Sequence, residues 1–383
     1  MSFTLARAIL RRTAHQASGF GAFLTMDKKR IFLYLIALTV LGVLVYVQFR
    51  TWRNFDWTTF WAQTHHVRKI HIFHGIALIY LAYVVRAIRW KIFLQPVRRD
   101  VKSMSLVAPT MIGFTGLALM GRPGELIRPF LIARRADLTF SSQLAVWAVE
   151  RIFDIAAYTV LLVMALFLTP GPKELHYYSR FRAGGFVLIG LSVGLTAAAI
   201  VVARSGEGLA QWVERRFSHL ASNLGSRIAL RIREFRSGLD TIHSPMSFLQ
   251  LTVVSLVMWC MIAVAYKEVT HAYQSEDLDI PQTQVLLLMG SSMVGSLIQL
   301  PGVGGGSQLA TIATLEHVFD APHELAASCG IMLWLVTFIA VVPLGLALAH
   351  HERLSLRQLS EESHRAEREG GLPVNASASP PGG

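Results

Sequence analysis

The strongest constraint on this chain is a series of apolar runs, several of which approach or exceed the roughly 18–20 residues that a helix needs to cross a bilayer. Of its 383 residues, 53% are hydrophobic and only 16% are charged. Soluble domains carry nearer about 25% charged residues, so this chain lacks the charge that would cover a wet surface. The pattern predicts an all-α polytopic membrane protein.

We expect six full spans, at about 31–49, 70–90, 140–168, 185–203, 247–266 and 325–349. They define a transmembrane domain of residues 31–350, which includes a cytoplasmic amphipathic segment at 204–245. A basic extension, 1–30, precedes this domain. The tail, 351–383, alternates Arg and Glu and then turns to Pro, Gly, Ser and Ala, a composition typical of disorder.

Basic loops set the expected orientation. Lys and Arg number 36 against 24 Asp and Glu, which gives a net charge of +12. The basic residues stand between apolar runs, where orientation and anionic lipids explain them better than nucleic acid does. The loop at 86–102, the segment at 204–245 and both termini are then cytoplasmic. We therefore expect a multi-pass protein of the cell (cytoplasmic or inner) membrane that contacts anionic lipids and no nucleic acid, with a homo-oligomer left open.

Two further apolar segments are short and interrupted by glycine and proline. The first, 104–137, breaks at Gly121–Glu125, and the second, 283–320, breaks at Pro301–Gly306. With the basic loops in the cytoplasm, the first segment must begin and end on the cytoplasmic side of the membrane and the second on the opposite side. We therefore expect two re-entrant hairpins of opposite sense. Such backbone is tolerated at membrane depth only where protein buries it or a wet cavity adjoins it, and paired broken helices are typical of transporter binding sites. The alternative is a pair of ordinary surface loops. The residues expected to approach a substrate are Gly121, Gly124, Pro301, Gly302, Gly304, Gly305 and Gly306.

Charged residues inside the predicted membrane region are the candidate site, and they are Arg122, Glu125, Arg128, Glu150, Arg151 and Asp154. A charge at a helix centre costs roughly 2.5–3.5 kcal/mol on insertion scales, so these side chains should face inward and be paired. Suitable pairs are Arg128 with Glu150, or Arg122 with Asp154. One helical face carries Gln143, Trp147, Glu150, Arg151, Asp154 and Tyr158. We interpret the set as a groove for a lipid headgroup, because arginine donates two parallel hydrogen bonds to phosphate. The alternative is a salt-bridge network that only pins the first hairpin.

Other polar residues have plainer interpretations. Arg86 and Arg89 end a span and are expected to snorkel to the interface. His71 and His74 lie one turn apart and are expected to be interfacial polar residues rather than metal ligands. Trp259 is expected to pack without a polar partner. We expect neither a metal nor a cofactor.

Two motifs carry a family resemblance: Gly121-Arg122-Pro123-Gly124-Glu125-Leu126-Ile127-Arg128, and then Glu150-Arg151-Ile152-Phe153-Asp154. Together with Arg86-Ala87-Ile88-Arg89-Trp90 and the late glycine-rich turn, they resemble the transmembrane region of lysylphosphatidylglycerol synthases over about residues 30–350. The resemblance implies the flippase part of that family, which moves modified phospholipid between leaflets, without the soluble synthase domain. One departure concerns the late loop, which often reads Pro-Gly-Gly-x-Gly with a nearby Glu in the family. Here the first carboxylate after the glycines is Glu316.

Three functions fit these features, and lipid translocation is favoured. A phospholipid, aminoacyl-lipid, glycolipid or hopanoid headgroup would pass through the polar groove between the broken helices. A membrane-embedded lipid-modifying transferase could use Glu150 and Asp154 as acid and base, but the sequence has no zinc-protease, phosphate-loop or Asp-rich metal motif. A membrane scaffold or regulator would bind a partner through 204–245. We therefore expect no enzyme activity and name no catalytic residue.

Overall fold

The computed structural model describes residues 55–168, 182–197, 208, 211, 244–297, 299–300 and 304–352. The chain divides into two compact units, 1–57 and 58–383, and the described fold is essentially that of the second. Several predicted parts lie outside the described residues: the extension at 1–30, the span at 31–49, most of the segment at 204–245 and nearly all of the tail at 351–383.

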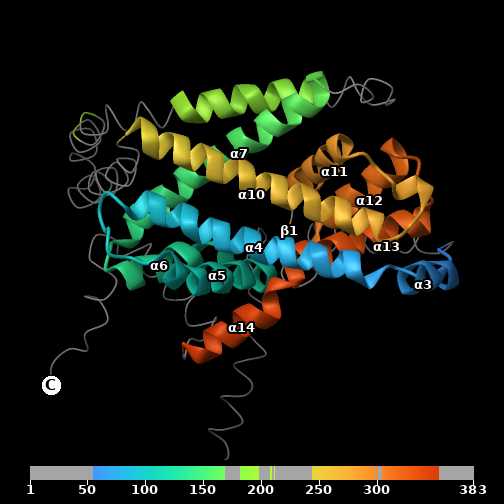
Figure 1. Ribbon diagram of the computed structural model, residues 1–383, viewed down its shortest axis with the longest axis horizontal. Coiled ribbons are helices and arrows are strands. Elements are labelled where there is room, and N and C mark those ends of the chain that lie inside the picture. Colours follow the sequence, from blue (N-terminus) through green and yellow to red (C-terminus); the bar gives the residue numbers. More distant parts are fainter. Residues whose placement is uncertain are drawn as a thin grey trace, which may run out of the picture. The chain divides into compact units, whose positions relative to one another are not determined.

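The described residues form helices, as predicted for an all-α protein (Figure 1). In chain order these are α3 (Trp57–His65), α4 (Lys69–Leu94), α5 (Val107–Met120), α6 (Ile127–Ala136), α7 (Phe140–Leu168), an apolar helix at Arg182–Ala197, α10 (Pro245–His271), α11 (Gln282–Gly295), α12 (Gly306–Val318), α13 (His323–Trp334) and α14 (Val341–His351). Short 3-10 turns are η1 (Ser103–Leu106), η2 (Arg122–Leu126) and η4 (Glu276–Leu278), and η5 (Leu335–Ile339) is π-helical. The exception to helix is a two-residue antiparallel pair, β1 (Gln299–Leu300) with β2 (Gly304–Gly305).

Four described segments are long and apolar enough to cross a membrane: 69–94, 103–120, 245–271 and 323–351. Three of them coincide with the predicted spans at 70–90, 247–266 and 325–349. The fourth, 103–120, covers the first arm of the hairpin predicted at 104–137. The span predicted at 140–168 is the single helix α7. An all-α membrane protein is therefore confirmed, whereas six spans and two re-entrant hairpins stay predictions.

The helices α4 and α10 form an antiparallel pair, side by side along their lengths (Figure 1). At about 1.5 Å per residue, their 26 and 27 residues reach about 39 Å, more than the roughly 30 Å hydrocarbon core of a bilayer. Their outward faces are apolar, since Phe73 is 66% exposed and Val257 is 47% exposed. Arg89 on the same pair is fully buried. Apolar side chains outside and a charge inside are the arrangement that a lipid environment favours.

The first broken segment consists of α5, the turn η2 and α6. Glycines allow its two helices to pack closely against each other. Gly121 ends α5 with φ 70°, a backbone conformation that favours glycine. A Cβ on Gly124 would lie 2.1 Å from the carbonyl oxygen of Gly116, and one on Gly113 would lie 2.4 Å from the Cβ of Arg128. Glycine at these positions therefore lets α6 lie directly against α5, which places Arg128 in the interior.

The second broken segment is α11, the β1–β2 pair and α12. The strands are in register with Gln299 opposite Gly305. Gly305 has φ 124° and its N–H donates to Oε1 of Gln308, 3.1 Å away, at the start of α12. A Cβ on Gly295 would lie 2.1 Å from the carbonyl oxygen of Gly306, so α11 and α12 meet closely at the turn.

The last apolar segment runs through α13, η5 and α14 and contains a π-helical turn. Such turns leave the regular hydrogen-bond ladder and often mark functional sites. Tyr80 of α4 donates to the carbonyl oxygen of Ala340 at 2.5 Å, and Tyr83 donates to that of Thr337 at 3.4 Å. Two tyrosine hydroxyls from α4 therefore bond carbonyl groups at this irregular turn, which fixes its position against α4.

Candidate functional site

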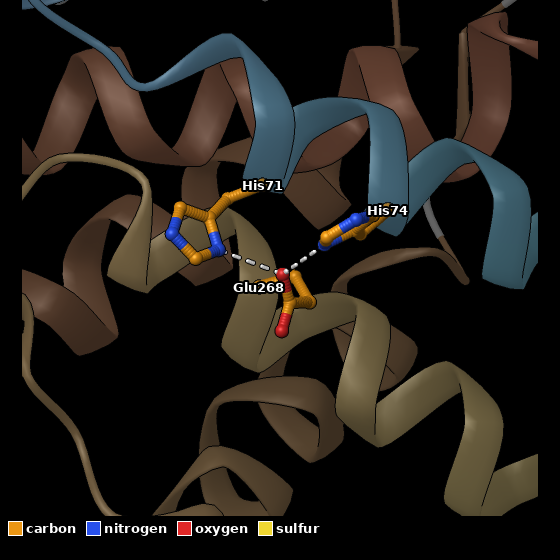
Figure 2. Close-up of side chains that lie close together, drawn as sticks. All are labelled: His71, His74 and Glu268. Carbon is orange, nitrogen blue, oxygen red and sulfur yellow. Dashed lines mark hydrogen bonds and ion pairs between the residues drawn. The ribbon is translucent and has the colours of Figure 1, made fainter.

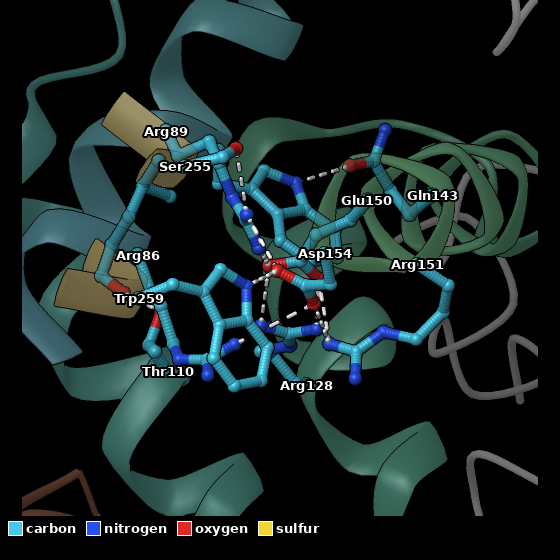
Figure 3. A network of polar contacts seen from close by, with 12 residues as sticks. Arg86, Arg89, Thr110, Arg128, Gln143, Glu150, Arg151, Asp154, Ser255 and Trp259 are labelled. Carbon is cyan, nitrogen blue, oxygen red and sulfur yellow. Dashed lines mark hydrogen bonds and ion pairs between the residues drawn. The ribbon is translucent and has the colours of Figure 1, made fainter. Parts of the chain in front are cut away.

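An ionic network lies inside the bundle and consists of Arg86, Arg89, Arg128, Glu150, Arg151 and Asp154 (Figure 3). The first two come from α4, the third from α6 and the last three from α7. Spacings of three and four residues put the members of each helix on one face. Three helices thus direct their charged side chains to a common point.

Glu150 is the most enclosed carboxylate of the network, with no exposed surface. Arg89 donates to its Oε1 from 2.5 Å. Arg128 donates to both of its oxygens, through Nη1 at 3.1 Å and through Nη2. Glu150 therefore joins α4, α6 and α7 through charge-assisted hydrogen bonds, one of them bidentate.

Asp154 is held by a different set of donors one helical turn further along α7. Its Oδ1 accepts from Arg89 at 2.7 Å and from the indole N–H of Trp259 at 3.2 Å. Its Oδ2 has Arg151 at 3.1 Å and Arg86 at 3.9 Å, although neither forms a hydrogen bond with it. Arg89 also donates to Ser255 at 3.0 Å, so α10 joins the network through two residues.

Positive charge exceeds negative charge in this network. Four guanidinium groups surround two carboxylates, so the positive charges of the set outnumber its negative charges by two. Arg86 is the least satisfied, because its Nη1 is buried and has no hydrogen-bond partner among the described residues. Its guanidinium instead lies 4.9 Å from the ring centre of Phe114, a cation–π contact. An anion is the ligand that would balance this surplus.

Two cavities adjoin the network, and Phe114 lines both of them. The larger has a volume of about 130 Å³ and is mainly apolar, with Arg86, Ser292 and Ser296 among its polar lining residues. The smaller, about 30 Å³, is lined by residues that include Arg128 and Arg151. The cationic side chains thus face spaces between the helices. The larger space thus combines a buried arginine with a mainly apolar lining.

Arg122 joins the turns of the two broken segments. Its Nη1 donates to Oε1 of Glu125 at 2.5 Å, and its Nη2 donates to the carbonyl oxygen of Ser296 at 2.8 Å. Ser296 follows α11 and also lines the larger cavity. With its side chain 46% exposed, Arg122 is more accessible than the network arginines of α4 and α6. The two segments, far apart in sequence, are therefore in contact.

The structure confirms one predicted ion pair and corrects the other. Arg128 pairs with Glu150 as expected. Arg122 does not pair with Asp154. It forms an ion pair with Glu125 and donates a hydrogen bond to the carbonyl oxygen of Ser296, after α11. The predicted snorkelling of Arg86 and Arg89 is also wrong, since both are buried and face acids on α7.

Trp259 is a further correction, because its indole donates to Asp154 instead of packing without a polar partner. The signal in the sequence was the spacing from Ser255, since residues four apart share a helix face. Other members of the predicted polar face have separate partners. Gln143 accepts from the indole of Trp90 at 3.0 Å, and Tyr158 donates to the carbonyl oxygen of Leu286 at 2.8 Å.

The predicted loop residues are only partly described. Gly121 and Gly124 form the first turn, and Gly304, Gly305 and Gly306 lead into α12. Pro301 and Gly302 lie outside the described residues.

These features define a class: a helical integral membrane protein that encloses a network of arginines and carboxylates. The chain belongs to the family described as the lysylphosphatidylglycerol synthase TM region, whose pattern matches residues 34–345. The match confirms the resemblance read from the sequence and associates the protein with lipid biology. Comparison with curated proteins and with solved structures finds no significant match.

Proposed function

We propose that this protein translocates lipid between the leaflets of the cell membrane, taking the headgroup through a polar groove between its broken helices. The observation that carries the proposal is the surplus of arginine in the buried network. Arginine binds phosphate through two parallel hydrogen bonds, so a phosphate-bearing headgroup supplies the charge that the network lacks. Phospholipids, aminoacylated lipids and glycolipids joined to phosphate meet this requirement.

The two broken segments support a groove that can be reached from both sides. In the proposed topology six spans surround two re-entrant hairpins of opposite sense, and both termini are cytoplasmic. The contact of Arg122 with Ser296 brings the two turns together next to the larger cavity. Paired interrupted helices that meet at midplane are typical of alternating-access carriers.

Transport fits the carboxylates better than catalysis does. Glu150 accepts hydrogen bonds from two arginines, and Asp154 accepts from an arginine and a tryptophan. Glu150 is fully buried and has both oxygens hydrogen-bonded, so it is poorly placed to exchange protons with a substrate. We therefore propose that the protein is not an enzyme.

The test is leaflet exchange in proteoliposomes with a fluorescent lipid whose outer-leaflet fraction is quenched chemically. We expect exchange of an anionic phospholipid, and the panel includes aminoacylated, glycosylated and zwitterionic lipids. Absence of exchange for every lipid in the panel contradicts the proposal.

Arg86→Gln separates a groove from a structural staple. Arg86 makes no close ion pair, so its loss should leave the fold intact and yet slow exchange at least about tenfold, the effect of about 1.4 kcal/mol in binding. The matched control is Arg98→Gln, which removes an exposed arginine 3.5 Å from Asp137 and should leave exchange unchanged. Exchange at the wild-type rate in Arg86→Gln would mean that the network is only a staple, as a scaffold or regulator requires.

A further inference from the structure

A second polar cluster lies at the opposite end of the α4–α10 pair. It consists of His71 and His74 of α4 and Glu268 of α10 (Figure 2). The Nδ1 atoms of His71 and His74 lie 2.8 Å and 3.3 Å from the same carboxylate oxygen, Oε2 of Glu268. Figure 2 shows both rings pointing at this one oxygen, with Glu268 between them.

Helix geometry explains why these three residues converge. His71 and His74 are three residues apart, so they share one face of α4. Glu268 and His271 have the same spacing on α10, which runs antiparallel to α4, and the ring of His271 lies 4.9 Å from that of His71. Each helix thus presents a pair of metal-ligating residue types to the other, as in metal sites built between the helices of bundles.

The ligand atoms have the spacing and chemistry of a transition-metal site. The donor atoms of His71, His74 and Glu268 all lie within 4.8 Å of one another. Tetrahedral zinc with bonds of about 2.0–2.2 Å keeps its ligand atoms about 3.4 Å apart, so small side-chain rotations suffice. Two imidazoles and one carboxylate are a zinc set that leaves a fourth position open.

The local charge also favours a cation. Lys267 donates to Asp279 at 2.7 Å, and these two charges balance each other. Among the described residues the direct partners of Glu268 are these two imidazoles, so no lysine or arginine of that part pairs with this carboxylate. All three side chains are reachable by water, with exposed fractions of 20%, 53% and 24%.

We propose that His71, His74 and Glu268 bind a divalent transition-metal ion of the zinc class, with the fourth position open to water or to His271. The site is independent of the lipid groove. It bridges the beginning of α4 and the end of α10. The other halves of these helices are joined by the bond between Arg89 and Ser255. The metal fixes the helix pair at the end remote from the network.

The experiment uses the purified full chain with a tag that contains no histidine, stripped by a chelator and dialysed. Zinc is added alone, and bound zinc per chain is measured by elemental analysis and by titration calorimetry. We expect one zinc per chain from this site. Cobalt(II) provides a spectroscopic probe, because its visible absorption reports nitrogen and oxygen ligands without thiolate.

Three substitutions test the ligands: His71→Ala, His74→Ala and Glu268→Gln. Each should weaken zinc binding by more than the roughly 10–100-fold that loss of an outer-shell partner costs. The matched control is His350→Ala, which removes an exposed histidine at the end of α14 and should bind zinc as the wild type does.

The outcome is decisive even if a histidine variant fails to fold. Glu268→Gln keeps the size of the side chain and an acceptor oxygen for the histidines, so its fold is expected to persist, as circular dichroism will check. Three outcomes would each overturn the proposal. They are wild-type zinc affinity in Glu268→Gln, no zinc binding by the wild type at micromolar concentration, and a cobalt spectrum with thiolate bands.

Discussion

Replacing Glu150 with glutamine should destabilise the fold more than any comparable change at a surface ion pair. The substitution keeps the shape of the side chain and removes the one charge shared by Arg89 and Arg128. Both guanidinium groups are almost completely buried, so water cannot take the place of the lost carboxylate. The surplus of positive charge in the network also rises by one.

The magnitude follows from the burial of the pair. Removing one partner of a buried ion pair costs about 3–5 kcal/mol, because the remaining charge is left uncompensated. The glutamine oxygen still accepts one hydrogen bond, so we expect the lower end, about 3 kcal/mol. That is more than a 100-fold change in the ratio of folded to unfolded protein, at about 1.4 kcal/mol per factor of ten.

The assay can use the chain's own thiols. Cys329 is fully buried, whereas Cys260 is exposed on the bundle surface. In a Cys260→Ser background, a maleimide dye that fluoresces on reaction with a thiol reports the unfolding of the core around Cys329. The unfolding midpoint of Glu150→Gln should fall on the order of 10 °C, at about 2–4 °C per kcal/mol.

Glu352→Gln is the matched control. Glu352 pairs with Arg135 at 2.9 Å on the surface, with 26% and 42% of the side chains exposed, and such pairs contribute about 0–1 kcal/mol. The reasoning is refuted if Glu150→Gln and Glu352→Gln lower the midpoint equally. A double variant that also carries Arg128→Gln should recover part of the loss, because one stranded charge is then removed as well.

Two further predictions concern packing and pH. Gly113→Ala should lower the same unfolding midpoint, because its Cβ would lie 2.4 Å from the Cβ of Arg128. The control Gly190→Ala should leave the midpoint unchanged, because its Cβ would have nothing within 4 Å. Equal midpoints for the two variants would contradict the close contact of α5 with α6. The hydrogen bond and charge of Lys267 lower the pKa of Asp279 below its ordinary 3.8. Because the folded pKa is depressed, this contact stabilises the fold above pH 3.8 and is lost as the pH falls through the lower value. In Lys267→Met the pKa of Asp279, measured by carboxyl NMR titration, should rise. An unchanged pKa would contradict the assignment of the shift to Lys267.

Much of the architecture is local in origin and could be predicted. Hydropathy located the helices α4, α10 and the segment 323–351, and glycine and proline located the breaks at Gly121 and near Gly305. The spans at 31–49 and 185–203 were not settled in this way, because the first lies outside the described residues and the second is described only at 182–197. Span counts depend on the lipid boundary, which helix geometry alone does not mark.

The pairing inside the network was only partly predictable. Arg128 with Glu150 followed from opposite charges that are 22 residues apart on neighbouring helices. The position of Arg89 at a span end predicts snorkelling, whereas the folded protein buries it completely. Its partner Glu150 is 61 residues away, and only the packing of α7 against α4 brings them together.

Hydropathy and the cost of charge in lipid act residue by residue. They were therefore enough to predict a helical membrane protein, its broken segments and the pairing of its buried charges. Apart from the pair of Arg128 with Glu150, the packing of the helices decided the partners. His71 meets Glu268 across 197 residues because α4 and α10 are antiparallel in one particular register. A shift of that register by one residue would turn each side chain about 100° around its helix and separate them, and no local pattern encodes such a register.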